Sequence, residues 1–257
     1  MNNLLFFSAV DNGYEDFIPL YVYFANKYNP NSKFEFLVKN LTNDFKELIN
    51  NFNKQFNTDI LLRNYTNNIN ANRLRFLEEP ITKCTYTYIG DIDIFINENI
   101  LPFHINQMKE FNTIYSNCLR YPSNTNRMSG LHFVKSDEYF KQTESIRNKY
   151  IKLLIDKKIT TGDEILLNNI ILSLNTCIIT PKDNIDFLIK RPIHGIHISL
   201  NRKPFTSTLE FPKELFKQMF IYDFYKSDDY TLINKFLSTK LQNILKTCET
   251  YSMFNNN

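Results

Sequence analysis

The stretch "YTYIGDIDIFI", residues 86–96, decides both the fold class and the position of the chemistry in this chain. Its aromatic and apolar residues are typical of a buried strand, yet it carries two aspartates, Asp91 and Asp93, directly after Gly90. Burying two carboxylates without compensation would cost several kcal/mol. The pattern therefore predicts that this strand leaves the core at its end and carries both carboxylates with it.

The residues before this stretch alternate short apolar runs with helical patterns. Strands separated by helices of this length indicate βαβ units and a mainly parallel sheet with helices on both faces. The predicted strands are 4–10, 33–40, 59–65 and 85–96, and the predicted helices are 14–28, 43–56 and 70–79.

Polar residues gather where such a sheet places its ligands. In open α/β sheets, ligands bind beyond the carboxyl ends of the strands. The first predicted strand is followed by "DNGY", residues 11–14, and the fourth by "GDID", residues 90–93. Two carboxylates at i and i+2 can face one hard cation, whose charge offsets their mutual repulsion. The alternative is an exposed aspartate pair that caps the next turn.

The second half has a looser pattern. It predicts strands at 113–119 and 131–135 and helices at 103–110 and 136–156. Thr161 and Glu164 have the spacing of a capping box before a further apolar helix. We expect one main domain, residues 1–210, and a small helical appendage, residues 211–257.

Composition excludes several classes of protein. The chain has 257 residues and a formal net charge of +3, without the clustered Lys and Arg that nucleic-acid binding needs. Four separated cysteines favour reduced thiols in a cytoplasmic protein over a disulfide framework or a zinc site. No apolar run approaches the ~20 residues of a membrane span.

The histidines divide into two pairs. His104 and His132 lie in apolar patterns, which favours buried structural roles. His194 and His197 lie in "RPIHGIHISLNRKPF", residues 191–205, which has little helical character. An imidazole can complete an oxygen-rich Mn²⁺ or Mg²⁺ shell, and a lysine suits a phosphate. By themselves these residues fit a binding site or a surface loop equally well.

The order of five segments resembles the nucleotide-sugar-dependent glycosyltransferases of the GT-A fold, closest to the family-8 type that includes bacterial lipooligosaccharide galactosyltransferases and glycogenin. The resemblance covers about residues 3–205, with Phe205 where the family has Trp. The segments are "FFSAVDNGY", "NRLRFL", "YIGDIDIFI", "GDEILLN" and "HGIHISLNRKPF".

This resemblance implies a GT-A (Rossmann-like) α/β fold, with a mixed, mainly parallel sheet flanked by helices and a small C-terminal helical appendage. It implies transfer of a hexose from a UDP-sugar to a glycan or lipid-linked glycan acceptor, in bacterial surface polysaccharide or lipooligosaccharide synthesis. The resemblance favours a retaining reaction, in which no protein base is obligatory. An inverting reaction would need a carboxylate, Asp163 or Glu164, to deprotonate the acceptor.

The implied site residues follow motif by motif. Arg73 matches an arginine that reaches the donor, or forms a surface ion pair. Asp163 and Glu164 match an acidic pair near the transferred sugar, and are also favourable at a helix N-terminus. The resemblance also implies that uracil and ribose contact Ala9, Asp11 and Tyr14. It implies that Mn²⁺ (or Mg²⁺) is bound by Asp91, Asp93 and His197, and that the diphosphate contacts Lys203.

One departure concerns the acceptor side. The family shows Asn and small residues in an "N-x-G" strand, where this chain has "NRMSGLHFV", residues 126–134. Ser129 and Gly130 can serve the same close approach.

The tail "FPKELFKQMFIYDFYK", residues 211–226, interleaves aromatic residues with lysines. It is expected to pack on the main domain; the alternative is an amphipathic helix at the inner membrane surface, near a lipid-linked acceptor. Two other functions remain open: a nucleotidyltransferase acting on sugar phosphates, and an inactive nucleotide-sugar or glycan-binding module. A nucleotidyltransferase is expected to have a Gly-rich loop early in the chain, and the segment "SAVDNGY" is not such a loop.

Overall fold

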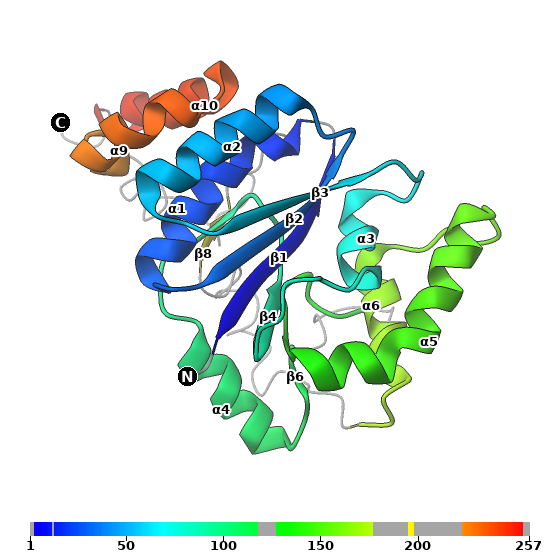
Figure 1. The fold of residues 1–257 in the computed structure, drawn as a ribbon. Coiled ribbons are helices and arrows are strands. Elements are labelled where there is room, and N and C mark those ends of the chain that lie inside the picture. The colour runs from blue at the N-terminus through cyan, green and yellow to red at the C-terminus, as the bar shows by residue number, and fades with distance from the viewer. Residues whose placement is uncertain (1–2, 12, 118–126, 177–194, 198–222, 254–257) are drawn as a thin grey trace.

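The structure is a computed structural model that describes residues 3–11, 13–117, 127–176, 195–197 and 223–253 (Figure 1). Helices and strands alternate through the first half, as predicted. The elements are β1 (Leu4–Val10), η1 (Tyr14–Phe17), α1 (Ile18–Tyr28), β2 (Lys33–Lys39), α2 (Asn43–Phe56), β3 (Ile60–Tyr65), α3 (Ala71–Leu77), β4 (Tyr86–Ile89), β5 (Ile94–Ile96), α4 (Leu101–Phe111), β6 (Tyr115–Ser116), β7 (His132–Lys135), α5 (Ser136–Ile155), α6 (Asp163–Leu172), β8 (Gly195–His197), α9 (Asp228–Ile233), η2 (Asn234–Phe236) and α10 (Thr239–Met253).

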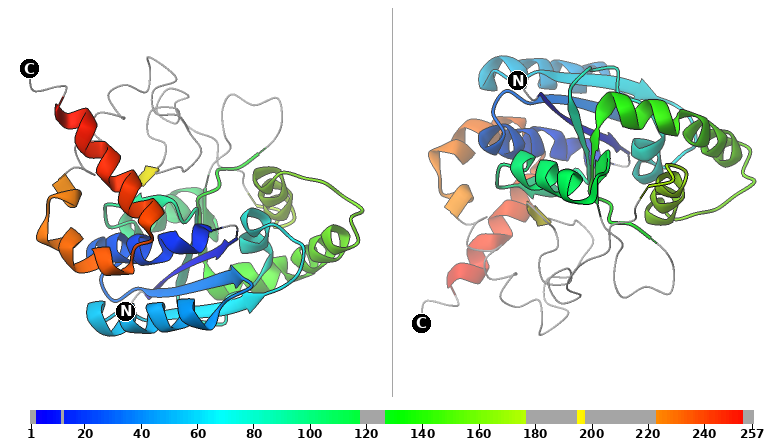
Figure 2. Two further views of the ribbon diagram at one scale, coloured as in Figure 1. Left: turned by 90° about the horizontal axis from the view of Figure 1, so that it is seen from above. Right: turned by 90° about the horizontal axis from the view of Figure 1, so that it is seen from below.

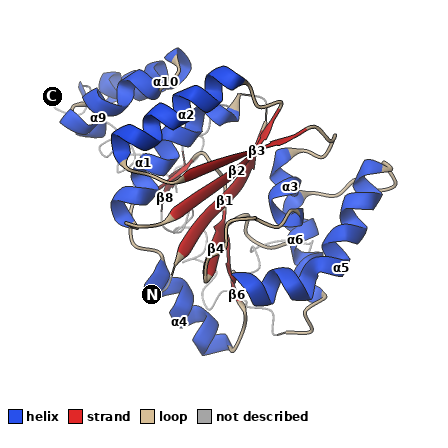
Figure 3. Cartoon of the chain, in the orientation of Figure 1, coloured by secondary structure: helices blue, strands red, loops and turns tan. Residues whose placement is uncertain are grey.

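Within the described residues, six strands form one mixed sheet in the order β3-β2-β1-β4-β7-β6. Figure 3 shows β3, β2, β1 and β4 side by side. The pairs β1–β2, β2–β3 and β1–β4 are parallel, and β7 runs antiparallel to β4 and β6. The strand order reverses direction between β1 and β4. This is the topological switch point at which an open α/β sheet binds its ligand.

Helices cover both faces of this sheet (Figures 1 and 2). The helices α1, α2 and α4 contribute to one buried cluster, and α3, α5 and α6 to the other. Local sequence explains several helix ends. Thr42 caps α2 by accepting a hydrogen bond from the Phe45 N–H, and Asn57 ends that helix in the left-handed conformation. The predicted bounds 43–56 are confirmed.

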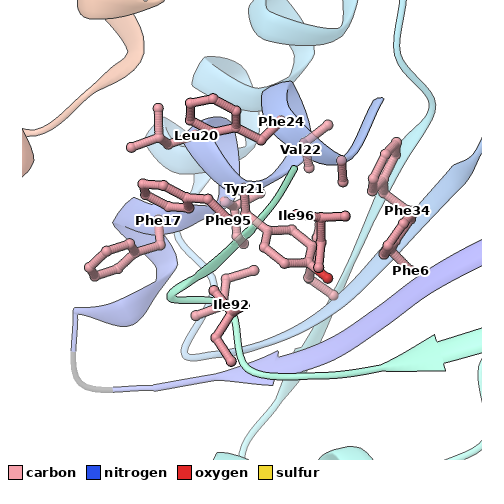
Figure 4. Packing of buried hydrophobic residues seen from close by; sticks show 14 of the residues in the cluster. Phe6, Phe17, Leu20, Tyr21, Val22, Phe24, Phe34, Ile92, Phe95 and Ile96 are labelled. Atoms are coloured by element: carbon pink, nitrogen blue, oxygen red, sulfur yellow. The ribbon is translucent and has the colours of Figure 1, made fainter. Parts of the chain in front are cut away.

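An aromatic core fills the space between the sheet and α1 (Figure 4). Phe6 of β1 stacks on Phe34 of β2, with ring centroids 5.4 Å apart. Phe24 of α1 stacks on Phe95 of β5 at 5.1 Å. Each such side chain buries a large apolar area, so this cluster is a main source of the fold's stability.

The C-terminal helices pack on the same side of the molecule, against α1 and α2 (Figure 1). Phe236 of η2 meets Phe52 of α2 with ring centroids 5.3 Å apart, and Phe224 meets Phe24 of α1 at 4.8 Å. The part of the 211–226 tail that is described thus packs on the main domain. The predicted boundary at 210/211 lies outside the described residues and stays a prediction.

Several side chains have the burial that the sequence indicated. His104 and His132 are 4% and 0% exposed, which confirms them as core residues. Cys84 is buried and carries a free thiol, and the other three cysteines lie outside the part whose side chains are described. The predicted strand 113–119 is reduced to β6. Among the described helices, none combines the length and apolar composition that crossing a membrane requires.

Candidate active site

The predicted strand 85–96 is two strands, which corrects the sequence interpretation. β4 ends at Ile89, a turn follows, and β5 begins at Ile94 away from the main sheet. The Ser8 hydroxyl donates to the Gly90 carbonyl oxygen at 2.8 Å, and the Ile94 N–H donates to the Asp91 carbonyl oxygen. The break lets the chain turn the aspartates to the carboxyl edge without placing a carboxylate in the sheet.

The turn after β1 lies at the same edge, because β1 and β4 are adjacent and parallel. Gly13 has φ +84°, a left-handed conformation that glycine adopts without strain. The Asp11 carboxylate accepts a hydrogen bond from the Ala71 N–H at 3.1 Å, and so ties this turn to the start of α3. Ala9 is buried in the core, and Tyr14 stacks on Phe17.

Helix α3 brings Arg75 into the site. This side chain is buried, and its guanidinium donates hydrogen bonds to Asp91 and, at 3.3 Å, to Asp163. Burial alone would lower the pKa of Arg75, but the carboxylates of Asp91 and Asp163, and then of Asp93, raise it above its usual value. Arg75 therefore carries a permanent positive charge between three carboxylates.

Sequence reasoning selected Arg73 and missed Arg75. Arg73 lies on the same helix, half-buried, and its Nε has no hydrogen-bond partner. Its predicted contact with the donor stays a prediction. One signal could have found Arg75: Ala71, Leu74 and Arg75 stand at the i, i+3, i+4 spacing of a buried helix face, where a charged residue is unusual.

The acidic pair opens helix α6. Asp163 lies against Arg75, and Glu164 lies 3.7 Å from the guanidinium of Arg127. The predicted capping box is wrong: Gly162 is the N-cap, no side chain caps the helix, and the Thr161 hydroxyl donates to the Gly162 carbonyl oxygen. Two arginines, rather than the capping box, hold these carboxylates at the site.

Small residues line the space next to Arg75. A Cβ atom on Gly130 would lie 3.2 Å from a guanidinium nitrogen of Arg75 and 3.4 Å from a carboxylate oxygen of Asp91. The Ser129 carbonyl oxygen accepts from the Asn117 amide, which also contacts His132 in the core. The close approach expected of Ser129 and Gly130 is therefore present at Gly130.

The side chains of two predicted cation ligands, Asp91 and Asp93, are described. Asp91 is partly exposed, while Asp93, two residues later, is 7% exposed. Strand β8 pairs antiparallel with β5, and the backbone of His197 stands opposite Ile94, the residue after Asp93. Carboxylates and an imidazole are ligand types that Mn²⁺ and Mg²⁺ accept. Among the side chains that are described, no three His, Cys, Asp or Glu residues form a metal cluster. The His197 side chain and all of Lys203 lie outside that part.

Comparison with solved structures identifies the fold. No family model matches the sequence, and no curated protein is significantly similar to it. The glycosyltransferase GlyE of Streptococcus pneumoniae TIGR4 superposes with a TM-score of 0.56 at 13% identity, over 91% of this chain and 63% of GlyE. The apo form of GlyE gives 0.54 at 14% identity, with the same coverage. This chain has the GT-A fold.

A second glycosyltransferase, LgtC, superposes less well. An active-site mutant of LgtC has a TM-score of 0.46 at 14% identity, over 69% of this chain and 72% of LgtC. Such a likeness adds nothing to the fold assignment. Because this chain spans less than two thirds of GlyE, and the identities are low, the comparison assigns the fold alone.

Proposed function

We propose that this protein is a metal-dependent glycosyltransferase that moves a hexose from a UDP-sugar to a glycan or lipid-linked glycan acceptor. One observation carries the proposal. Arg75 holds Asp91 of the D-x-D stretch and Asp163 of the acidic pair together at the carboxyl edge of the sheet, although the three lie far apart in the sequence. A donor bound at the switch point would meet both acidic groups.

The chain's own residues would divide the work of donor binding. Asp91, Asp93 and His197 would hold Mn²⁺ or Mg²⁺, which supplies electrostatic stabilisation of the departing diphosphate. Lys203 would add a positive charge at that diphosphate. Ala9, Asp11 and Tyr14 would line the nucleoside end, since the turn that carries them lies beside the D-x-D turn. Arg73 would reach the donor from α3.

Asp163 and Glu164 would act on the sugar end. Both are already compensated by guanidinium groups, so they can orient sugar hydroxyls at little further desolvation cost. In a retaining reaction, which we favour, the leaving phosphate takes the acceptor proton. Synthesis of a bacterial surface polysaccharide or lipooligosaccharide is the proposed context, with the enzyme in the cytoplasm or peripherally at the inner membrane face.

Calorimetric titration of UDP, with GDP and CDP as controls, tests the donor class in Mn²⁺ and again in EDTA. Metal-dependent binding selective for UDP is expected, followed by hydrolysis of a UDP-sugar. The variant Asp93→Asn should lose Mn²⁺-dependent UDP binding and retain its fold. Asp137→Asn, in the exposed first turn of α5, is the matched control. Failure of all three nucleotides to bind with Mn²⁺ present would end the glycosyltransferase proposal.

Product assays separate the other functions. A nucleotidyltransferase would release pyrophosphate from a nucleoside triphosphate and a sugar phosphate. An inactive module would bind a nucleotide sugar without turning over any donor.

A further inference from the structure

Arg75 has a position that simple ion pairing on a surface does not explain. It is 3% exposed, it contacts carboxylates from two separate segments, and a Cβ atom at Gly130 would lie only 3.2 Å from its guanidinium group. A buried carboxylate or guanidinium is tolerated only when its charge is compensated. Asp91 and Asp163 therefore provide the negative charge that the buried Arg75 guanidinium needs.

Two guanidinium groups lie against carboxylates at this site. Arg75 contacts Asp91 and Asp163, and the guanidinium of Arg127 lies 3.7 Å from Glu164. The Asp91 carboxylate that would bind the cation is the one that Arg75 already contacts.

We propose that Arg75 is a positioning residue that competes with the metal ion for Asp91 and couples the metal site to the acidic pair. This inference rests on the proposed function, because it takes Asp91 as a metal ligand. In the structure Arg75 is shared between Asp91 and Asp163. When Asp91 turns to the ion, Arg75 keeps Asp163 as its partner, so the start of α6 responds to metal binding.

A competing Arg75 and an Arg75 that only positions Asp91 predict opposite changes in metal affinity. If Arg75 only held Asp91 in place for the ion, its removal would weaken metal binding. If Arg75 competes, its removal strengthens metal binding, since the ion no longer displaces a guanidinium group and meets a more negative site. By linkage, the ion must weaken the Arg75–Asp91 contact as much as that contact weakens the ion's binding.

Direct Mn²⁺ binding, followed by the electron paramagnetic resonance signal of free Mn²⁺, distinguishes these roles without any turnover. We expect the Kd of Arg75→Met to be roughly tenfold lower than that of the wild type, equivalent to about 1.4 kcal/mol. Arg127→Met removes a positive charge that lies against Glu164 instead of Asp91. It should change the Kd by less than about threefold.

Other results would contradict the proposed competition between Arg75 and the metal ion. Weaker Mn²⁺ binding by Arg75→Met, or equal gains in both variants, would overturn the competition. If Arg75→Met does not fold, Arg75→Lys replaces it. A lysine cannot contact both carboxylates as a guanidinium group does, so Mn²⁺ affinity should still rise, but the gain should be smaller because the positive charge remains. Wild-type protein that binds neither Mn²⁺ nor UDP rejects the proposed function as well, whereas normal wild-type binding with an unchanged variant rejects only the role of Arg75.

Discussion

His197 stands opposite Ile94 in the antiparallel pair formed by β8 and β5, which brings a distant segment to the residue that follows Asp93. Opposed residues in such a pair have Cα atoms about 5 Å apart. The pairing joins the D-x-D turn to the histidine segment through the backbone. It gives the proposed third metal ligand a structural reason to lie near the turn that carries Asp91 and Asp93.

We expect His197→Gln to weaken Mn²⁺ binding by about 100-fold, because loss of an imidazole leaves the ion with two carboxylates from this chain. His194→Gln, in the same "HGIH" stretch, is the matched control and should bind Mn²⁺ as the wild type does. Titration of both variants with Mn²⁺ provides the measurement. A loss confined to His194→Gln would show that the wrong histidine has been assigned.

Gly130→Ala tests the close approach beside Arg75 and Asp91. The added methyl group would be tight against both side chains, so they must shift by a few tenths of an ångström. We expect UDP-sugar turnover to fall by about tenfold, since small misplacements in a site are costly. In Gly162→Ala the new Cβ meets only Ile165, at 4.0 Å, and turnover should stay near the wild-type rate. Equal activities would mean that Gly130 does not shape the site.

Much of the fold could be predicted because its signals are local. Strand β1 and helix α2 have the predicted bounds. The apolar run of seven residues marks the strand, and the amphipathic pattern with its N-cap residue marks the helix, so both can be located from neighbouring residues alone. The end of β4 at Ile89 was not predicted, because the apolar pattern continues through Ile96 while the chain leaves the main sheet. The short β6 was overestimated for a similar reason, as its length is set by pairing with β7.

The site was predictable only in part. The aspartates at the strand end and the acidic pair were selected from the order of motifs, and the structure brings Asp91 and Asp163 together through Arg75. Arg75 was missed because Arg73, two residues earlier on the same short helix, is chemically the same. Only the rotation of α3 against β1 decides which arginine faces Asp91.

Arg147 supports the helix that carries Arg75. It is buried in α5, and its guanidinium donates to the Leu77 carbonyl oxygen at the end of α3 and to the Phe140 carbonyl oxygen. Arg147→Met would leave both carbonyl groups without this donor and should lower the free energy of unfolding by about 3 kcal/mol. Urea denaturation measures this change. Lys149→Met, on the exposed side of the same helix, should change it by less than about 0.5 kcal/mol.

The C-terminal helices are predicted to be part of the stable core. Phe236 is 7% exposed and packs against Phe52 and Phe56 of α2, whereas Leu232, four residues earlier, is 48% exposed. Phe236→Ala should cost about 3 kcal/mol through lost burial and the cavity it leaves. Leu232→Ala should cost less than about 0.5 kcal/mol. Similar small losses in both would mean that this segment contributes little to folding, and would leave it available for the alternative role at a membrane.

His132 should make the protein sensitive to acid. Its ring is fully buried among Phe76, Tyr115 and Tyr139, and burial lowers its pKa from 6.5 to about 3. The unfolded chain therefore binds a proton at His132 below about pH 6.5, while the folded protein does not until about pH 3. The contribution of His132 to stability is intact above pH 6.5 and is lost progressively as the pH falls between these two values.

The size of this effect follows from the proton linkage of one group. In that range the free energy of unfolding should fall by about 1.4 kcal/mol per pH unit because of His132 alone. His132→Phe keeps an aromatic ring in the cluster but cannot titrate, so its free energy of unfolding should depend less steeply on pH between 6.5 and 5. Urea denaturation at several pH values compares the two proteins. An NMR titration in which His132 protonates near pH 6.5 in the folded state would contradict the prediction, since a ring that titrates normally adds no such slope.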